Sequence, residues 1–348
     1  MESVKCILCG AASGTVLVQQ RDINLGSSLE VFTVVRCDGC GLIFQNPRPT
    51  ADEIRRYYPP EYYPLEESGV RRPIDRVFKR WSNSMKRAIR EEFYAYPGQS
   101  GGSRSKARRA LQRLILAPEY WHLRFARRDC IPFRGTGRIL DVGCGPGRLL
   151  RSLRDQGWEA HGVDFSPVAV EHAKTKHGLE VKLGELAAAA YPDSFFDVVV
   201  FSHSLEHVYD PVDTLREAHR ILKTAGLLLI YVPNAGSFES FVFGKWWVPW
   251  DVPRHLFHFT SETMTRLLHR TRFRLVKVRH GVGTGSFLGS VDTVYKHVLR
   301  TGMKHGSVMR HFIAMPVCMV AGHLGYGGEL QVYAEKAMKD SHRVTSPP

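Results

Sequence analysis

The sequence contains no uninterrupted apolar run of about 18 residues, the length that a membrane-spanning helix requires. Its first residues, MESVKCILCG, also lack the basic region and the apolar stretch of a secretory signal. We therefore expect a cytoplasmic protein without a spanning helix. With 348 residues, of which 43% are hydrophobic, the chain can form a main domain with appendages.

Acidic residues are scarce in one part of the chain. Between Arg71 and Arg134 there are 17 Lys and Arg but only five Asp and Glu, a net charge of +12 out of +14 for the whole chain. Leu111, Leu114 and Ile115 have helical spacing, so this basic segment is expected to be helical. Its charge has two interpretations: a solvated helix face, or contact with the phosphates of nucleic acid or of anionic lipid at the inner face of a membrane.

Cysteine is also sparse, and the seven cysteines fit metal binding in a reducing compartment better than a disulfide framework. Four of them form two C-x-x-C pairs, each followed by glycine: Cys6 with Cys9, and Cys37 with Cys40. Four thiolates suit tetrahedral zinc with no open position, so residues 1–49 are predicted to be a structural zinc ribbon. A redox pair and coincidental thiols are the alternatives. Cys130, Cys144 and Cys318 have no such spacing and are expected to be small buried residues.

The most informative stretch is RILDVGCGPGRLLR, residues 138–151. It reads as a short buried strand, a turn with glycines at alternate positions (Gly143, Gly145 and Gly147) and the start of a helix. Because glycine has no Cβ, a ligand can lie against the chain where the strand hands over to the helix. A second acid, Asp164, ends another apolar strand 23 positions after Asp141. A structural βαβ unit with chance glycines is the alternative.

This order of strand, D-x-G-x-G-x-G turn, helix, strand and terminal acid resembles the class I S-adenosylmethionine-dependent methyltransferases. The resemblance implies that Asp141 and the glycines bind S-adenosylmethionine beside its methionine part, and that Asp164 accepts hydrogen bonds from two ribose hydroxyls. Glu185, at the end of the third strand, would lie near the adenine. Similar zinc-ribbon and tyrosine-rich segments precede the methyltransferase domain in a branch that acts on sugars and other small metabolites.

The predicted fold class is α/β, with a Rossmann-like seven-stranded methyltransferase sheet and helices on both faces. We assign residues 135–348 to this domain, with a helical insertion at 282–328 before the last strand. The insertion is expected to be a packed helical pair, a lid or a surface that touches lipid. Residues 50–134 form a connector and the basic helical segment. Four connector tyrosines either line a substrate cleft or pack the ribbon on the main domain: Tyr57, Tyr58, Tyr62 and Tyr63.

The loop after the fourth strand reads Ser202-His203-Ser204-Leu205-Glu206-His207. It matches the H-x-x-E-H motif of inverted zinc proteases, but that motif needs a helix and this one follows a buried strand. It also resembles the Glu-x-x-Glu-His of ubiquinone-pathway O-methyltransferases, which is assigned to a divalent metal. Glu206 and His207 match it. His203 replaces the first Glu, which would favour zinc or iron over magnesium.

Methyl transfer from a sulfonium requires alignment of the reacting atoms and, for an oxygen or carbon nucleophile, removal of a proton. His207 is the first candidate for this base and His203 the second. The alternative is that both merely bond the loop backbone. Downstream, exposed Trp246, Trp247 and Trp250 are expected to form a substrate wall, to which Arg254, His255 and His258 add polar groups.

The leading hypothesis is a methyltransferase that acts on an oxygen or carbon of a small metabolite, sugar or lipid-linked acceptor. An RNA methyltransferase that uses the ribbon and the basic segment is one alternative, and a non-catalytic S-adenosylmethionine-binding module is another. The loop after the fourth strand lacks an N-P-P-Y signature of base methylation, so a specific nucleic-acid partner is not expected. The sequence does not bear on the oligomeric state.

Overall fold

The structure is a computed structural model that describes residues 1–59, 62, 84–97, 111–117, 120, 131–300 and 309–337. Residues 84–93 and 111–117 are helical. The rest of the basic segment between Arg71 and Arg134 lies largely outside the described residues, as do Tyr63 and Cys130. The interpretations of that segment's charge therefore stay predictions.

A seven-stranded sheet forms the centre of the molecule, in the order β10-β11-β8-β7-β4-β5-β6. The five strands β8, β7, β4, β5 and β6 run parallel to one another, whereas β11 is antiparallel to both β8 and β10. The expected methyltransferase sheet with an antiparallel last strand is confirmed. The strands are β4 (Arg138–Val142), β5 (Glu159–Asp164), β6 (Glu180–Leu183), β7 (Phe196–Ser202), β8 (Leu222–Pro233), β10 (Phe273–Gly281) and β11 (Glu329–Lys336).

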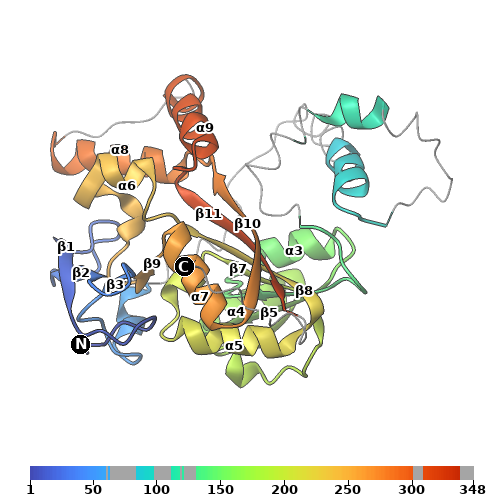
Figure 1. Ribbon diagram of the computed structural model, residues 1–348, viewed down its shortest axis with the longest axis horizontal. Coiled ribbons are helices and arrows are strands. Elements are labelled where there is room, and N and C mark those ends of the chain that lie inside the picture. Colours follow the sequence, from blue (N-terminus) through green and yellow to red (C-terminus); the bar gives the residue numbers. More distant parts are fainter. Residues whose placement is uncertain are drawn as a thin grey trace, which may run out of the picture.

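Helices cover both faces because successive residues of each central strand point to opposite sides. Val199 and Phe201 of β7 belong to one hydrophobic core, with side chains from α5 (Pro211–Ile221) and α7 (Ser261–Arg270). Val198 and Val200 belong to another, with Leu153 of α3 (Arg148–Arg154) and residues of the helical stretches 84–93 and 111–117. A third core joins α3 to α4 (Pro167–His177). Figure 1 shows α5 and α7 on the side of the sheet opposite to α3.

The zinc-ribbon region is a four-stranded antiparallel sheet in the order β1-β2-β3-β9. Its first three strands are β1 (Gly14–Gln20), β2 (Phe32–Cys37) and β3 (Ile43–Gln45). The fourth, β9 (Phe257–His258), comes from the segment after β8, more than 200 positions along the chain. Phe32 and Phe44 share a hydrophobic core with Phe201 and Phe259. The ribbon thus packs as part of the main body.

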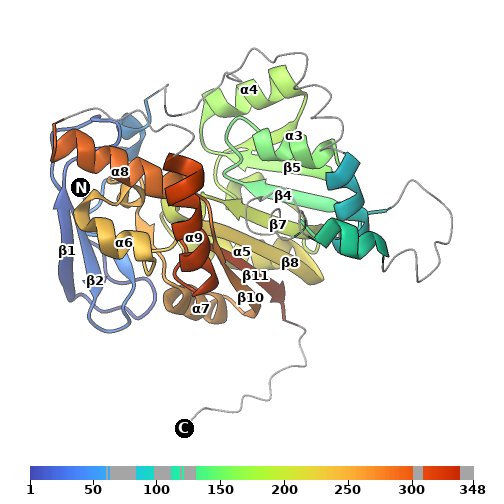
Figure 2. The same ribbon diagram turned by 90° about the horizontal axis from the view of Figure 1, so that it is seen from above.

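A group of helices lies over the ribbon side of the sheet. It comprises α6 (Phe238–Phe243), α8 (Gly285–His297) and α9 (Met315–His323), the last preceded by a π-helical turn at Met309–Ala314. The described part of the insertion is therefore largely helical, as expected. Figure 2 shows these helices beside β1 and β2, at the opposite end from α3 and α4. Within the described ranges, every helix is too short or too polar to cross a membrane.

Candidate functional site

The glycine-rich turn after β4 has the backbone conformation that its sequence predicts. Gly143, Gly145 and Gly147 all have positive φ, at 72°, 52° and 81°. A Cβ at Gly143 would lie 2.4 Å from the Ser204 Cβ, and one at Gly147 would lie 2.4 Å from Leu179 Cδ1. Glycine is therefore required at both positions by backbone conformation and by packing.

Asp164 lies against this turn. Its Oδ2 accepts a hydrogen bond of 2.7 Å from the Gly145 amide, and its Oδ1 accepts one of 2.9 Å from the Ser166 amide. Burial raises the pKa of Asp164, although these two bonds favour its ionised form. A carboxylate offers about four acceptor sites, so lone pairs remain for a ligand. The turn and the acid that the sequence singled out are thus brought together.

Asp141 and Glu185 occupy the neighbouring strand ends. Asp141 is buried in β4, and its Oδ1 has no hydrogen-bond partner among the described residues. Burial, together with the charge of Asp164, raises the pKa of Asp141 well above its usual value. Glu185 lies two residues after the end of β6 and is exposed. Both stand at the edge where the parallel strands end, which is where such sheets bind ligands.

His203 has an unusual conformation for a residue with a side chain. Its φ is +55°, a backbone conformation that costs free energy and that tends to cluster at functional sites. Its Nε2 lies 2.9 Å from Glu329 Oε2, and its Nδ1 lies 3.3 Å from Glu206 Oε1. The side chain is 31% exposed, whereas that of Glu206 is 1% exposed. His203 therefore stands between two carboxylates and remains accessible.

His207 is partly buried, like His203. Its Nδ1 is 3.0 Å from both the Tyr58 hydroxyl and the Arg254 carbonyl oxygen. Burial and the nearby His255 lower the pKa of His207 to about 4, so its imidazole is neutral near pH 7. The sequence makes His207 the first candidate base, but His203 lines the cavity at the strand ends and His207 is not among the lining residues.

A cavity of about 600 Å³ opens beside His203. It draws residues from the strand ends (Pro233 and Glu329), from the ribbon (Ile23 and Asn24) and from the segment before β9 (Asp251 and His255). The α8 helix closes it with polar side chains: Ser286, Asp292, Thr293, Lys296 and His297. This lining contains many donors and acceptors, which suits a polar acceptor molecule.

Glu206, His207 and His255 converge beside this cavity, each placing one ligand atom within 4.8 Å of the others. The Nδ1 atoms of His207 and His255 face backbone carbonyl oxygens at 3.0 and 2.8 Å, so both carry a hydrogen and leave Nε2 with a lone pair. Apart from the His203 ion pair, neither Glu206 oxygen has a hydrogen-bond partner among the described residues. Glu206 and His207 belong to the loop motif, but the third member of the group is His255 and not His203. Two nitrogens and one oxygen are a donor set that suits zinc or iron.

The prediction that three tryptophans form a substrate wall is wrong. Trp247 and Trp250 are buried and pack edge to face in the main core, with ring centroids 5.1 Å apart. The Trp250 indole donates to the Gly244 carbonyl. Trp246 is half-buried and stacks on His297. The segment folds back against the ribbon, so its large aromatic side chains fill an interface and Val248 and Pro249 face the cavity.

Arg254 was also expected in the pocket, but it is fully buried in an ion pair. Its guanidinium donates two hydrogen bonds to Asp22 of the ribbon, at 2.8 and 2.9 Å, and two to Asp251, at 2.7 and 3.1 Å. Asn24 donates to Asp251 and to the Val248 carbonyl. These ribbon residues carry no motif. Glu329 is the one cavity residue outside the motifs that the sequence could have indicated, because the start of an antiparallel last strand lies at the ligand-binding edge.

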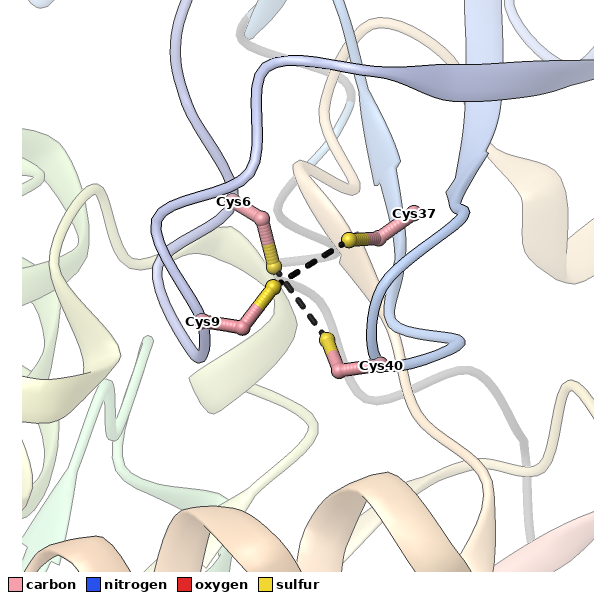
Figure 3. A group of neighbouring side chains, drawn as sticks. All are labelled: Cys6, Cys9, Cys37 and Cys40. Carbon is pink, nitrogen blue, oxygen red and sulfur yellow. Dashed lines mark hydrogen bonds between the residues drawn. The ribbon is translucent and has the colours of Figure 1, made fainter.

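The four motif cysteines converge at one end of the ribbon sheet, as Figure 3 shows. Cys6 Sγ lies 3.4 Å from Cys40 Sγ, and Cys9 Sγ lies 3.4 Å from Cys37 Sγ. Gly10 and Gly41, both with positive φ, donate to the Cys6 and Cys37 carbonyls and close the two knuckles. Burial opposes ionisation of Cys37, but amide hydrogen bonds from Cys40 and Gly39 outweigh it and lower the pKa of its thiol to about 7. The donor set fits tetrahedral zinc.

The tyrosines of the connector divide between two roles. Tyr57 is buried against Phe32 of the ribbon, and its hydroxyl donates to Glu30. Tyr58 packs edge to face on Phe165, the residue after Asp164, and also on Tyr62. The Tyr58 hydroxyl also contacts His207 Nδ1. Tyr58 therefore links the connector to the loops that follow β5 and β7.

Comparison with known proteins gives consistent matches. A probable S-adenosylmethionine-dependent methyltransferase of Mycolicibacterium smegmatis is 28% identical over 176 residues, which cover 47% of this chain and 64% of that protein. A ubiquinone biosynthesis O-methyltransferase of Ruegeria pomeroyi is 40% identical over 109 residues, 30% of this chain and 43% of that protein. The chain thus spans less than two thirds of either relative.

Among solved structures, a SAM-dependent methyltransferase from Archaeoglobus fulgidus covers 64% of this chain and 94% of its own, with 19% identity and a TM-score of 0.41. The profile of a methyltransferase domain family matches residues 104–278, half of the chain. With this match, the glycine-rich turn facing Asp164 and the order of the seven strands, the chain belongs to the class I S-adenosylmethionine-dependent methyltransferase family.

Proposed function

We propose that this protein transfers a methyl group from S-adenosylmethionine to an oxygen or carbon of a small polar acceptor, such as a sugar or a lipid-linked molecule. One observation carries the proposal. The glycine-rich turn with Asp164 and the polar cavity with His203 and Glu329 lie at the ends of strands in one sheet. A donor on the first and an acceptor in the second would meet at that edge. The similarity to a ubiquinone biosynthesis O-methyltransferase supports an oxygen acceptor.

The chemistry requires little help with the leaving group, because S-adenosylhomocysteine departs neutral. The bond between sulfur and methyl breaks as the bond from methyl to the acceptor oxygen forms, and the acceptor loses a proton. In our proposal the His203–Glu329 pair takes this proton. Glu329 faces the cavity, with Oε2 on His203 and Oε1 accepting from Gln331. A cation on Glu206, His207 and His255 would polarise an acceptor oxygen nearby.

Cofactor binding is tested through Asp164. Loss of two ribose hydrogen bonds should cost on the order of 2 to 3 kcal/mol, so Asp164→Ala should weaken S-adenosylmethionine binding roughly 30-fold to 150-fold. Calorimetry on wild type and variant measures this directly. Glu171→Ala, on the exposed side of α4, is a control that should leave the affinity unchanged. Equal affinity in wild type and Asp164→Ala would remove the assignment.

The acceptor side is tested by comparing the two histidines. With methyl-labelled S-adenosylmethionine and a panel of nucleotide sugars, phenols and lipid-linked sugars, His203→Asn and Glu329→Gln should each lower kcat roughly 100-fold. Their affinity for S-adenosylmethionine should stay near that of wild type. His172→Asn on α4 is the matched histidine control. If His207→Asn loses turnover while His203→Asn keeps it, the base is His207, as the sequence alone suggested.

A further inference from the structure

A broad apolar groove lies between the ribbon and the helices α6 and α9. Its volume is about 970 Å³, and its walls include Leu17 and Ile43 of the ribbon sheet. Five of its lining side chains are large, apolar and exposed to solvent: Phe238, Phe241, Val320, Leu324 and Tyr326. Phe241 is 87% exposed, and leaving so large an apolar side chain in water is costly.

The apolar surface continues beyond the groove onto convex parts of the same helices. Val242 of α6 and Met319 of α9 are exposed, and so are Phe312 and Ile313 in the π-helical turn before α9. A peptide helix docked in the groove would leave these outer side chains uncovered. A lipid surface would cover the groove and the convex part together.

The charged residues of this face are basic. Arg36 and Lys245 line the groove, and no Asp or Glu is among its lining residues. Arg310 is exposed one turn before α9, and residues 309–328 contain no acid. On α6 the acidic residue Glu239 is buried, where it accepts a hydrogen bond from Ser286. Such a face attracts anionic headgroups.

A second copy of this chain is a poor occupant, because it brings the same basic residues, Arg36 and Lys245, to the contact. An anionic bilayer supplies both missing elements, an apolar phase for Phe241 and Val320 and negative charge for Lys245 and Arg36. We propose that this face docks on a membrane surface that contains anionic phospholipid. The exposed side chains of α6 and α9 enter the headgroup boundary, and the basic residues contact phosphates.

The position of this face connects it to the acceptor cavity. The α8 helix packs on α6 and also supplies Ser286, Thr293, Lys296 and His297 to the cavity. Docking through α6 and α9 therefore brings the cavity close to the bilayer, where an amphiphilic acceptor would be concentrated. The delivery of an acceptor to the cavity rests on the proposed function, whereas the docking itself does not.

The test is cosedimentation of the full-length protein with vesicles, in the absence of S-adenosylmethionine and acceptor. We expect binding to vesicles of phosphatidylcholine with phosphatidylglycerol to be roughly 30-fold tighter than to phosphatidylcholine alone, and to weaken as salt is added. Phe241→Ser with Val320→Ser should weaken binding by roughly 10-fold or more, and Lys245→Gln should reduce the preference for anionic vesicles.

Leu29→Ser is the matched control, since Leu29 is 81% exposed but does not line the groove. Its binding should equal that of wild type. Equal vesicle binding by wild type and by the Phe241/Val320 variant would overturn the proposal. So would a dimer in sedimentation velocity that Phe241→Ser dissociates, if the protein ignores both kinds of vesicle. Because no turnover is measured, failure here leaves the methyltransferase proposal standing, and the reverse also holds.

Discussion

Asp141 and Asp164 are carboxylates at the ends of adjacent strands, yet their surroundings differ. Asp164 receives two backbone amide hydrogen bonds, whereas the Oδ1 of Asp141 has no partner within the described part of the chain. A buried acceptor without a partner costs about 1 to 3 kcal/mol. Such a group is retained when it serves a ligand, and the positively charged methionine part of S-adenosylmethionine is the ligand that the family implies.

We predict that Asp141→Asn stabilises the ligand-free protein and weakens cofactor binding. The pKa of Asp141 is raised in the folded state, so its contribution to stability is greatest at low pH and is lost as the pH rises above about 4. The advantage of asparagine should therefore grow from pH 4 to pH 7, reaching on the order of 1 kcal/mol.

Thermal unfolding of both proteins over this pH range, without and with S-adenosylmethionine, checks the prediction. Added cofactor should raise the melting temperature of wild type more than that of the variant. An asparagine variant that is less stable at every pH would mean that the carboxylate is satisfied in the free protein.

The ribbon is an element whose sheet is completed by a distant strand. β9 pairs with β3 through Phe257 and Phe44, and the loop after β1 carries Ile23 and Asn24 to the acceptor cavity. The cysteines lie at the other end of this sheet, where Cys37 ends β2 and pairs with Gly14 at the start of β1. A metal in this element therefore supports one wall of the cavity and contributes no open coordination position.

We expect one zinc per chain on Cys6, Cys9, Cys37 and Cys40, detectable by elemental analysis. Replacing Cys37 and Cys40 by serine should remove this zinc and lower the melting temperature, because the ribbon shares the main hydrophobic core. The Kd for S-adenosylmethionine should change little, since its turn lies on β4, whereas the KM for the acceptor should rise.

Cys318→Ser is the control, because Cys318 is a buried thiol outside both sites. It should keep its zinc. Zinc retained after the double replacement would place the metal elsewhere, with Glu206, His207 and His255 as the first site to examine.

At the scale of the whole molecule, one buried ion pair joins the loop after β1 to the segment before β9. Arg254 and Asp22 are both fully buried and lie 232 positions apart in the chain. The hydrogen bonds of this pair and of Asp251 hold the turn at residues 22–27 against the segment before β9. Removal of one partner would leave the other carboxylates buried and uncompensated.

Arg254→Met should therefore destabilise the protein by about 3 to 5 kcal/mol, measured by urea unfolding at neutral pH. Adding Asp22→Asn to this variant should recover part of the loss, because it removes one uncompensated charge. Arg266→Met breaks an exposed pair with Glu262 on α7 and should cost less than about 1 kcal/mol. Equal effects of the two arginine changes would show that the buried pair does not join the two parts.

The sequence by itself determined the cofactor turn, its acid partner and the cysteine pairs. Gly143, Gly145, Gly147 and the C-x-x-C knuckles are local, since their geometry follows from the backbone freedom of glycine and from short spacing along the chain. The alternation of apolar strands and helices predicted the sheet for the same reason, because residues two or three apart decide each element.

The tertiary structure decided which side chains meet in the acceptor cavity. Asn24, His203 and Glu329 come from three distant segments, and no spacing relates them. The same holds for burial: Trp247 and Trp250 resemble an exposed aromatic wall in the sequence, but the ribbon covers them. A side chain's exposure depends on what packs against it, and those contacts form between residues that are far apart along the chain.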